Sequence, residues 1–227
     1  MLNFTYNNLE ISIYEGAEEA PLVLIHEDHG EGEAVWSLLE NAGVSCTLAC
    51  IRGMKWKHEL APWDAPASFK KGEPFTGGGE AHLHCIVREI LPKIERQTGH
   101  EFSEKYIGGY SLAGLFAMYS TYLTEVFAGF VSASGSMWFP EFLEYVKSHP
   151  ISENVEKAYF SIGDKEGKTK NPVMKCVEEN TREIEQYLKE KGIKTIFELN
   201  QGGHFVDDDL RLAKGIQWIL GGNIWAS

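Results

Sequence analysis

The segment 105–122, KYIGGYSLAGLFAMYSTY, constrains the fold more than any other part of the chain. It begins as a strand-like run, turns through small residues around Ser111, and continues as an almost wholly apolar helix. Side chains at Gly109 and Ala113 would crowd each other in such a turn, so both positions need small residues. A serine on a sharp strand-to-helix turn is exposed above the sheet edge, where it can act as a nucleophile.

The spacing around this serine is G-x-S-x-A-G, with Ala113 in place of the second glycine of the usual G-x-S-x-G pattern. The preceding strand and the following helix favour the nucleophile elbow of α/β-hydrolases. The alternative is a structural serine that caps backbone N–H groups at a glycine-rich helix start.

Length and charge narrow the class of protein. The 227 residues suit a single α/β domain spanning 1–227. A net charge of −12 argues against nucleic acid or an anionic membrane as a partner. The N-terminus lacks a signal-peptide pattern, no run of 18 apolar residues occurs, and the four cysteines form no CxxC. We therefore expect a cytoplasmic protein with free thiols; the oligomeric state is left open.

The order of elements predicts the architecture. An N-terminal hairpin is followed by alternating strands and helices, which implies a mostly parallel central sheet with helices on both faces, an α/β fold. Residues 54–79 are rich in Pro, Gly and aromatic residues and predict a long ordered loop. The predicted strands are 2–6, 9–15, 22–26, 46–53, 105–107, 127–136, 157–163 and 194–201; helices are expected near 32–42 and 80–97, after Ser111, after Pro140, after Pro172 and after His204.

A nucleophilic serine needs a base and a group that orients the base, and in this fold they follow in the order serine, acid, histidine. Of the eight histidines, only His204 follows the carboxyl end of a predicted strand downstream of Ser111. The preceding strand ends in a turn with two candidate acids, Glu166, which we rank first, and Asp164. Either acid could instead be a solvated turn charge.

The oxyanion formed during acyl transfer needs backbone N–H donors. One is expected from Leu112, the residue after the nucleophile, at the positive end of the following helix. The second is expected from the loop after strand 22–26, where Glu27 is the first choice and Asp28 lies behind it.

With these motifs in hand, the chain resembles the α/β-hydrolase esterases of the putative-esterase family, which includes esterase D and the siderophore esterases. The resemblance rests on GYSLAGL, SIGDKEGK and GGHF and covers nearly the whole chain. It implies hydrolysis of a small-molecule carboxylic ester by Ser111 and His204, without a metal or an organic cofactor. The acid carries over only as a choice between Asp164 and Glu166.

Two features depart from the family pattern. The first oxyanion loop is HEDHGEGE rather than a glycine-rich loop, which puts the second oxyanion donor in doubt. There is little or no lid insertion, which suggests an open site for a short or medium acyl group. Aromatic residues beside the predicted strand ends, Trp63, Trp138 and Tyr110, are candidates to face the substrate, although they could equally pack the loops together.

Two other classes of function remain as alternatives. A metal hydrolase is suggested by the histidines and acids of 26–31 and by His82 and His84. However, H-E-D-H is not H-E-x-x-H, and two helical positions two residues apart point about 200° apart, so no metal site is predicted. A non-catalytic binding protein with this fold is the second alternative. A thioesterase, amidase or peptidase would use the same catalytic residues.

Overall fold

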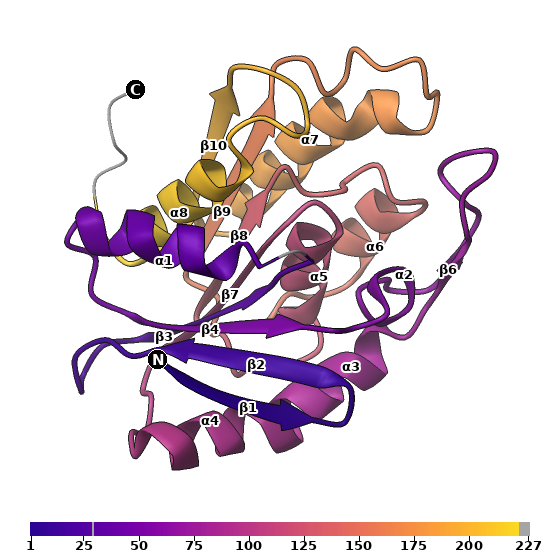
Figure 1. Ribbon diagram of the computed structural model, residues 1–227. Helices are drawn as coiled ribbons and strands as arrows, with labels where there is room; N and C mark the ends of the chain where they lie inside the picture. The colour runs from indigo at the N-terminus through magenta and orange to yellow at the C-terminus, as the bar shows by residue number, and fades with distance from the viewer. Residues whose placement is uncertain (29, 223–227) are drawn as a thin grey trace.

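The central sheet is described by a computed structural model that covers residues 1–28 and 30–222. In these residues, eight strands form one sheet in the order β1-β2-β4-β3-β7-β8-β9-β10 (Figure 1). β2 pairs antiparallel with β1 and β4, and all other neighbours are parallel. The strands are β1 (Leu2–Tyr6), β2 (Leu9–Tyr14), β3 (Leu22–His26), β4 (Thr47–Arg52), β7 (Lys105–Tyr110), β8 (Gly129–Ala133), β9 (Lys157–Gly163) and β10 (Lys194–Asn200).

Helices cover both faces of this sheet (Figure 1). α1 and α8 pack together on one face, and the other helices that cover the sheet lie on the opposite face. The predicted α/β architecture, with its N-terminal antiparallel hairpin, is therefore confirmed. The helices are α1 (Gly32–Asn41), α2 (Trp56–Glu59), α3 (Gly79–Cys85), α4 (Leu91–Thr98), α5 (Leu112–Ser120), α6 (Phe142–Ser148), α7 (Val177–Glu190) and α8 (Asp208–Ile219).

The alternation of side chains explains the two cores. Along β3 every residue is buried, as expected for a strand covered on both faces. Leu22 and Leu24 belong to the core beneath α3, α4 and α5, whereas Val23 and Ile25 belong to the core beneath α1 and α8. Two hydrophobic layers thus hold the middle strands rigidly between them.

One predicted loop is more regular than expected, and one predicted helix is interrupted. Residues 54–79 contain α2 and a two-stranded ribbon, β5 (Asp64–Ala65) and β6 (Phe75–Thr76). The helix expected at 80–97 is divided into α3 and α4 by a π-helical segment, Ile86–Ile90. Pro92 lies in the first turn of α4 and has no N–H to donate, which fits the wider turn before it. A short 3₁₀ turn, Met174–Cys176, precedes α7.

The parallel strands place three sequence-distant loops at one edge of the sheet. Ser111 follows β7, Glu166 lies in the turn after β9, and His204 lies in the loop after β10. Ligands of open α/β sheets bind outside the carboxyl ends of the strands. The candidate site therefore lies at this edge.

Candidate active site

Ser111 occupies a strained turn between β7 and α5. Its backbone has φ 59° and ψ −120°, a conformation that is unfavourable for a residue with a side chain. A Cβ built on Gly109 would lie 2.5 Å from the Cβ of Ala113, and one on Gly114 would lie 2.9 Å from the Gly109 carbonyl. The crowding expected from the sequence is therefore present.

Ser111, His204 and Glu166 form a continuous chain of hydrogen bonds. His204 Nε2 lies 2.9 Å from Ser111 Oγ, and His204 Nδ1 lies 2.7 Å from Glu166 Oε2. Ser136 Oγ is a further neighbour, 3.5 Å from Ser111 Oγ. The imidazole thus bridges a hydroxyl and a carboxylate, which is the arrangement that activates a serine.

The carboxylate of Glu166 is held from several sides. Its side chain is 5% exposed, and Oε1 accepts hydrogen bonds from Gly163 N–H at 2.8 Å, Ser134 Oγ at 2.8 Å and Arg211 Nη1 at 3.1 Å. Burial by itself would raise the pKa of Glu166. The hydrogen bond and charge of His204 and the hydrogen bonds from Gly163 and Ser134 together outweigh burial. The pKa of Glu166 therefore lies below its ordinary value.

Asp164, the other candidate acid, has a different partner. Its Oδ1 accepts the N–H of Gly202 at 2.8 Å, and its own N–H donates to the Asn200 carbonyl. These bonds shape the loop that leads to His204. Of the two acids left open by the sequence, the geometry places Glu166 against the imidazole.

The two predicted oxyanion donors differ in their availability. Leu112 is the first residue of α5. The residue four positions earlier lies outside the helix, so the Leu112 N–H has no acceptor within α5. The Glu27 N–H instead donates to the Ile51 carbonyl at 2.9 Å, continuing the pairing of β3 with β4. The choice of Glu27 as the second donor is therefore wrong. The Asp28 N–H donates to Glu31 Oε2 at 3.1 Å.

Two cavities meet at Ser111. The smaller, of about 240 Å³, is bordered by β3, the loop before α1 and the start of α8 and carries carboxylates. The larger, of about 560 Å³, is lined mainly by apolar and aromatic side chains, with lysines among them. Ser111, His204, Trp56 and Phe205 border both cavities. The carboxylates of the smaller cavity are Glu27, Asp28, Glu31, Asp208 and Asp209, and the lysines of the larger are Lys57, Lys165 and Lys168.

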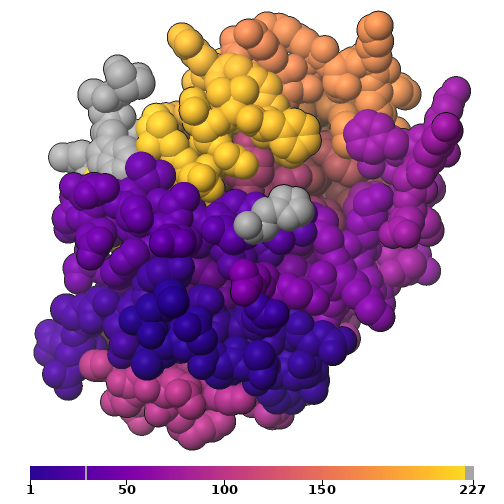
Figure 2. Space-filling model, in the orientation of Figure 1, coloured from indigo at the N-terminus to yellow at the C-terminus, as the bar shows by residue number. Residues whose placement is uncertain are grey.

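Loops from distant parts of the chain build the wall of the larger cavity. The loop between β5 and β6 projects beside the segment after β9 (Figures 1 and 2). Asn171 Nδ2 donates to the Ser68 carbonyl at 2.6 Å and joins the two loops. The neighbouring Phe69 is 59% exposed and lines the cavity.

The three aromatic candidates for substrate contact have different surroundings. Trp138 lines the larger cavity and Tyr110 the smaller. The Tyr110 O–H also donates to the His204 carbonyl at 2.6 Å, and burial raises the pKa of Tyr110 to about 12, so it stays protonated. Trp63 borders neither cavity, and its prediction as a substrate contact is wrong. It packs on an aromatic cluster, with Nε1 donating to the Pro140 carbonyl at 3.1 Å.

Two of the histidines weighed as metal ligands, His26 and His82, contact each other, whereas His29 lies outside the described residues. His26 Nε2 and His82 Nε2 lie 3.0 Å apart, and both rings are buried against Phe116. Burial lowers the pKa of His82 to about 4 and that of His26 well below its ordinary value, which keeps the pair neutral. His84 is exposed. Over residues 1–28 and 30–222, no group of three or more His, Cys, Asp or Glu is arranged to hold a metal ion.

Arg211 and Ser134 contact the acid and were not singled out from the sequence. Arg211 lies in the predicted last helix, where a charged residue between apolar positions resembles any solvated charge. Gly215 lies four residues later on the same helix face. A residue that small permits close packing on the sheet, so it indicates that the face carrying Arg211 is buried.

The architecture and the placement of these residues define the class, an α/β-hydrolase fold. The chain belongs to the putative-esterase family, whose model matches residues 46–208. The resemblance drawn from GYSLAGL, SIGDKEGK and GGHF is thereby confirmed.

Individual proteins resemble the chain more distantly. The uncharacterised protein YbbA of Bacillus subtilis (strain 168) is 28% identical over 137 residues, which are 59% of this chain and 55% of that protein. The matched region therefore spans about half the length of this curated relative. The BES protein of Bacillus cereus has a TM-score of 0.72 at 18% identity, covering 96% of this chain and 95% of that one. The siderophore hydrolase EstA of Aspergillus nidulans has a TM-score of 0.69 at 15% identity, covering 96% and 93%.

Among the helices of the described residues, none combines the length and apolar character needed to cross a membrane.

Proposed function

We propose that this protein is a serine hydrolase that cleaves carboxylic esters through an acyl-enzyme on Ser111. The observation that carries the proposal is the hydrogen-bonded chain from Ser111 Oγ through His204 to Glu166 Oε2, with separations of 2.9 and 2.7 Å. Membership in an esterase family supports it. A binding protein would need neither the strained turn at Ser111 nor a carboxylate placed on the far side of the imidazole.

In the proposed reaction, His204 Nε2 accepts the Ser111 proton while Oγ forms a bond to the ester carbonyl carbon. The carbonyl oxygen becomes an oxyanion, which the Leu112 N–H stabilises at the start of α5. His204 then donates the proton to the alcohol as the carbon–oxygen bond breaks. A water molecule, deprotonated by His204, releases the acid and restores Ser111. Glu166 keeps Nδ1 protonated and stabilises the imidazolium.

The cavities bear on the substrate. We assign the larger cavity, with Trp138, Phe75 and Phe69, to the bulkier apolar part of the ester, and the smaller cavity to a short or medium acyl group. A second candidate is a siderophore ester, because EstA is named a siderophore hydrolase. Lys57, Lys165 and Lys168 favour it, because they would attract the negative charge of an iron-chelating ligand.

The test is hydrolysis of p-nitrophenyl acetate, butyrate and octanoate by wild type and Ser111→Ala in parallel. We expect short-chain activity that falls by at least about 10³-fold in the variant, because the members of such a triad act as a unit. Hydrolysis that persists in Ser111→Ala would show another nucleophile and contradict the proposal.

A fluorophosphonate probe provides a control that does not depend on the choice of ester. It should label wild type and not Ser111→Ala. If wild type neither hydrolyses the esters nor reacts with the probe, the binding-protein alternative replaces the hydrolase.

A further inference from the structure

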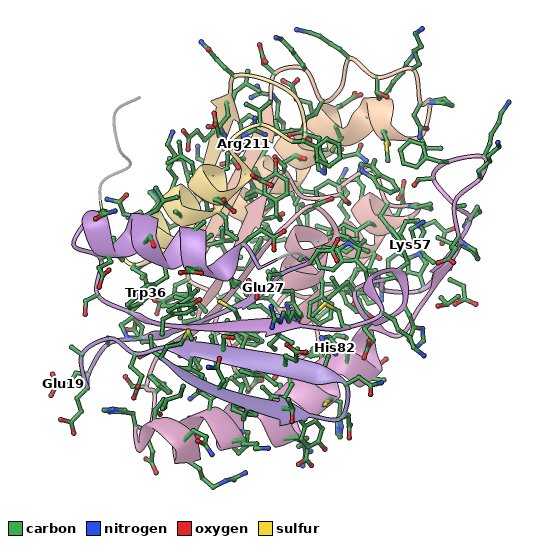
Figure 3. All side chains as sticks on the ribbon, viewed as in Figure 1. Glu19, Glu27, Trp36, Lys57, His82 and Arg211 are labelled. Carbon is green, nitrogen blue, oxygen red and sulfur yellow. The ribbon has the colours of Figure 1, made fainter. Side chains whose placement is uncertain are left out.

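Arg211 is a buried cation at the back of the proposed site. It lies on α8, on the face of the sheet opposite α5, and its side chain is 1% exposed (Figure 3). A buried ion pair is weak evidence for stability, since desolvation offsets much of the attraction between the charges. The position of this guanidinium therefore calls for another explanation.

Four of the five acceptors of Arg211 belong to the segments that carry the three proposed catalytic residues, and the fifth, Ser134, itself donates to Glu166. Nη1 donates to the acid, to Ser134 and to the residue before the nucleophile, and Nη2 donates to two carbonyls of the loop that carries His204. The contacts of Nη1 are Glu166 Oε1 at 3.1 Å, Ser134 Oγ at 3.0 Å and Tyr110 Oη at 3.2 Å, and those of Nη2 are the carbonyls of Gln201 at 3.0 Å and Gly203 at 3.1 Å.

Two neighbours reinforce this arrangement. The Tyr110 O–H that accepts from Arg211 donates in turn to the His204 carbonyl at 2.6 Å. A Cβ built on Gly163 would lie 2.4 Å from the Gly202 carbonyl oxygen and 3.0 and 3.1 Å from the two terminal nitrogens of Arg211, so glycine at this position lets both the His204 loop and the guanidinium pack closely on the end of β9. One planar group thus connects the ends of β7 and β9 with the loop after β10.

We propose that Arg211 is a positioning residue that holds the Glu166 carboxylate and the His204 loop in register with Ser111. The proposal rests on the catalytic roles assigned above. The two terminal nitrogens of Arg211 have separate roles. Nη1 places a positive charge at Glu166 Oε1 so that Oε2 faces the imidazole, and Nη2 fixes the backbone on both sides of Gly202.

The charge has a measurable consequence. A cation beside Glu166 offsets part of the field that the carboxylate exerts on the imidazole. Without this cation, the protonated imidazole is favoured, and a protonated imidazole cannot accept the serine proton. Removal of the charge should therefore move the acid limb of the kcat/KM profile to higher pH, by about 0.5 to 1 pH unit.

The experiment compares three variants by their pH profiles of kcat/KM on p-nitrophenyl butyrate. Arg211→Met should lower kcat/KM about 100-fold and move the acid limb upward, because both contacts and charge are lost. Arg211→Lys keeps the charge, so its acid limb should stay near that of wild type. Its kcat/KM should still fall about tenfold, because an ammonium cannot reach both carbonyls of the His204 loop.

Lys214→Met is the matched control. Lys214 is also a buried cation of α8, paired with Glu198 Oε1 at 2.8 Å, but it contacts none of the proposed catalytic residues. Its replacement should lower the melting temperature, leave kcat/KM within about threefold and leave the acid limb unchanged. If Arg211→Met behaves in the same way as Lys214→Met, Arg211 is merely structural and the proposal is overturned.

An independent measurement separates this proposal from the proposed function. The low-field imidazole proton of His204, observed by NMR with ¹⁵N-labelled histidine, reports the bond to Glu166 whether or not an ester is hydrolysed. It should be present in wild type and Lys214→Met and weakened or lost in Arg211→Met. Should Arg211→Met fail to fold, Arg211→Lys still tests the proposal. Its kcat/KM should fall about tenfold while the acid limb of its pH profile stays near that of wild type. An intact signal with wild-type kcat/KM in Arg211→Lys would overturn the proposal.

Discussion

At the residue scale, the two oxygens of Glu166 perform different tasks. Oε1 accepts from Gly163, Ser134 and Arg211, whereas among the residues that the structure describes Oε2 accepts from His204 alone. The side chain cannot rotate without breaking several bonds to one oxygen. The other oxygen is thus presented to the imidazole in a fixed direction, which is what an orienting acid requires.

Replacement of each candidate acid by its amide tests this assignment. Glu166→Gln should reduce kcat/KM by about 10³-fold, because an amide neither stabilises the imidazolium nor enforces the productive tautomer. Asp164→Asn retains a carbonyl oxygen for the Gly202 N–H and should cost less than about tenfold. Steady-state kinetics at neutral pH would reveal the reverse order if Asp164 were the acid.

At the element scale, local and long-range features were predictable to different degrees. The elbow, the hairpin and the positions of His204 and Glu166 at strand ends follow from short patterns of residue type and spacing. The fate of the Glu27 N–H depends on the register between β3 and β4, which pairs His26 with Ile51, and no local pattern contains that register. The same holds for Trp63, whose partners come from α5, α6 and the Phe139 region.

The contrast between Trp63 and Trp138 gives an element-scale prediction. Trp63→Ala should lower the free energy of unfolding by about 3 kcal/mol, because it leaves a void among Tyr119, Phe142 and Tyr145. KM for p-nitrophenyl esters should remain within about twofold. Trp138→Ala should instead raise KM about three- to tenfold for the bulkier esters, because this ring lines the larger cavity.

Denaturant titrations alongside kinetics of the two variants check this pair. A rise in KM for Trp63→Ala that matched Trp138→Ala would mean that Trp63 contacts the substrate after all.

At the scale of the whole molecule, the site lies where opposite charges gather on either side of the reacting serine. The smaller cavity carries five carboxylates, and the larger carries three lysines and the carboxylate of Glu166, although the chain has a net charge of −12. Trp56, His204 and the 90% exposed Phe205 border both cavities. For the proposed ester substrate, this separation would favour one direction of binding, because only that direction places each charged end beside the opposite sign.

Two carboxylates that border the cavities, Glu166 and Glu27, couple folding to pH with opposite signs. The pKa of Glu166 lies below its ordinary value of 4.5, so its ionised form stabilises the folded state above pH 4.5, and this contribution is lost as the pH falls through the folded pKa. Burial raises the pKa of Glu27, despite the hydrogen bond that its carboxylate accepts from Gly32. Its ionised form is therefore a cost to folding at neutral pH, and the cost disappears as the pH falls below 4.5.

Two amide variants should consequently move stability in opposite directions. At pH 7, Glu166→Gln should unfold at a lower urea concentration than wild type, by about 1 to 3 kcal/mol, since it also leaves the Arg211 charge without its carboxylate. Glu27→Gln keeps an oxygen for the Gly32 N–H and should be as stable as wild type or more stable at pH 7. The Glu27→Gln difference should shrink as the pH is lowered from 7 towards 4.5, whereas the Glu166→Gln difference should shrink only as the pH falls below 4.5. If the stability of Glu27→Gln relative to wild type instead falls at pH 7, the Glu27 carboxylate stabilises the fold and the sign assigned to it is wrong.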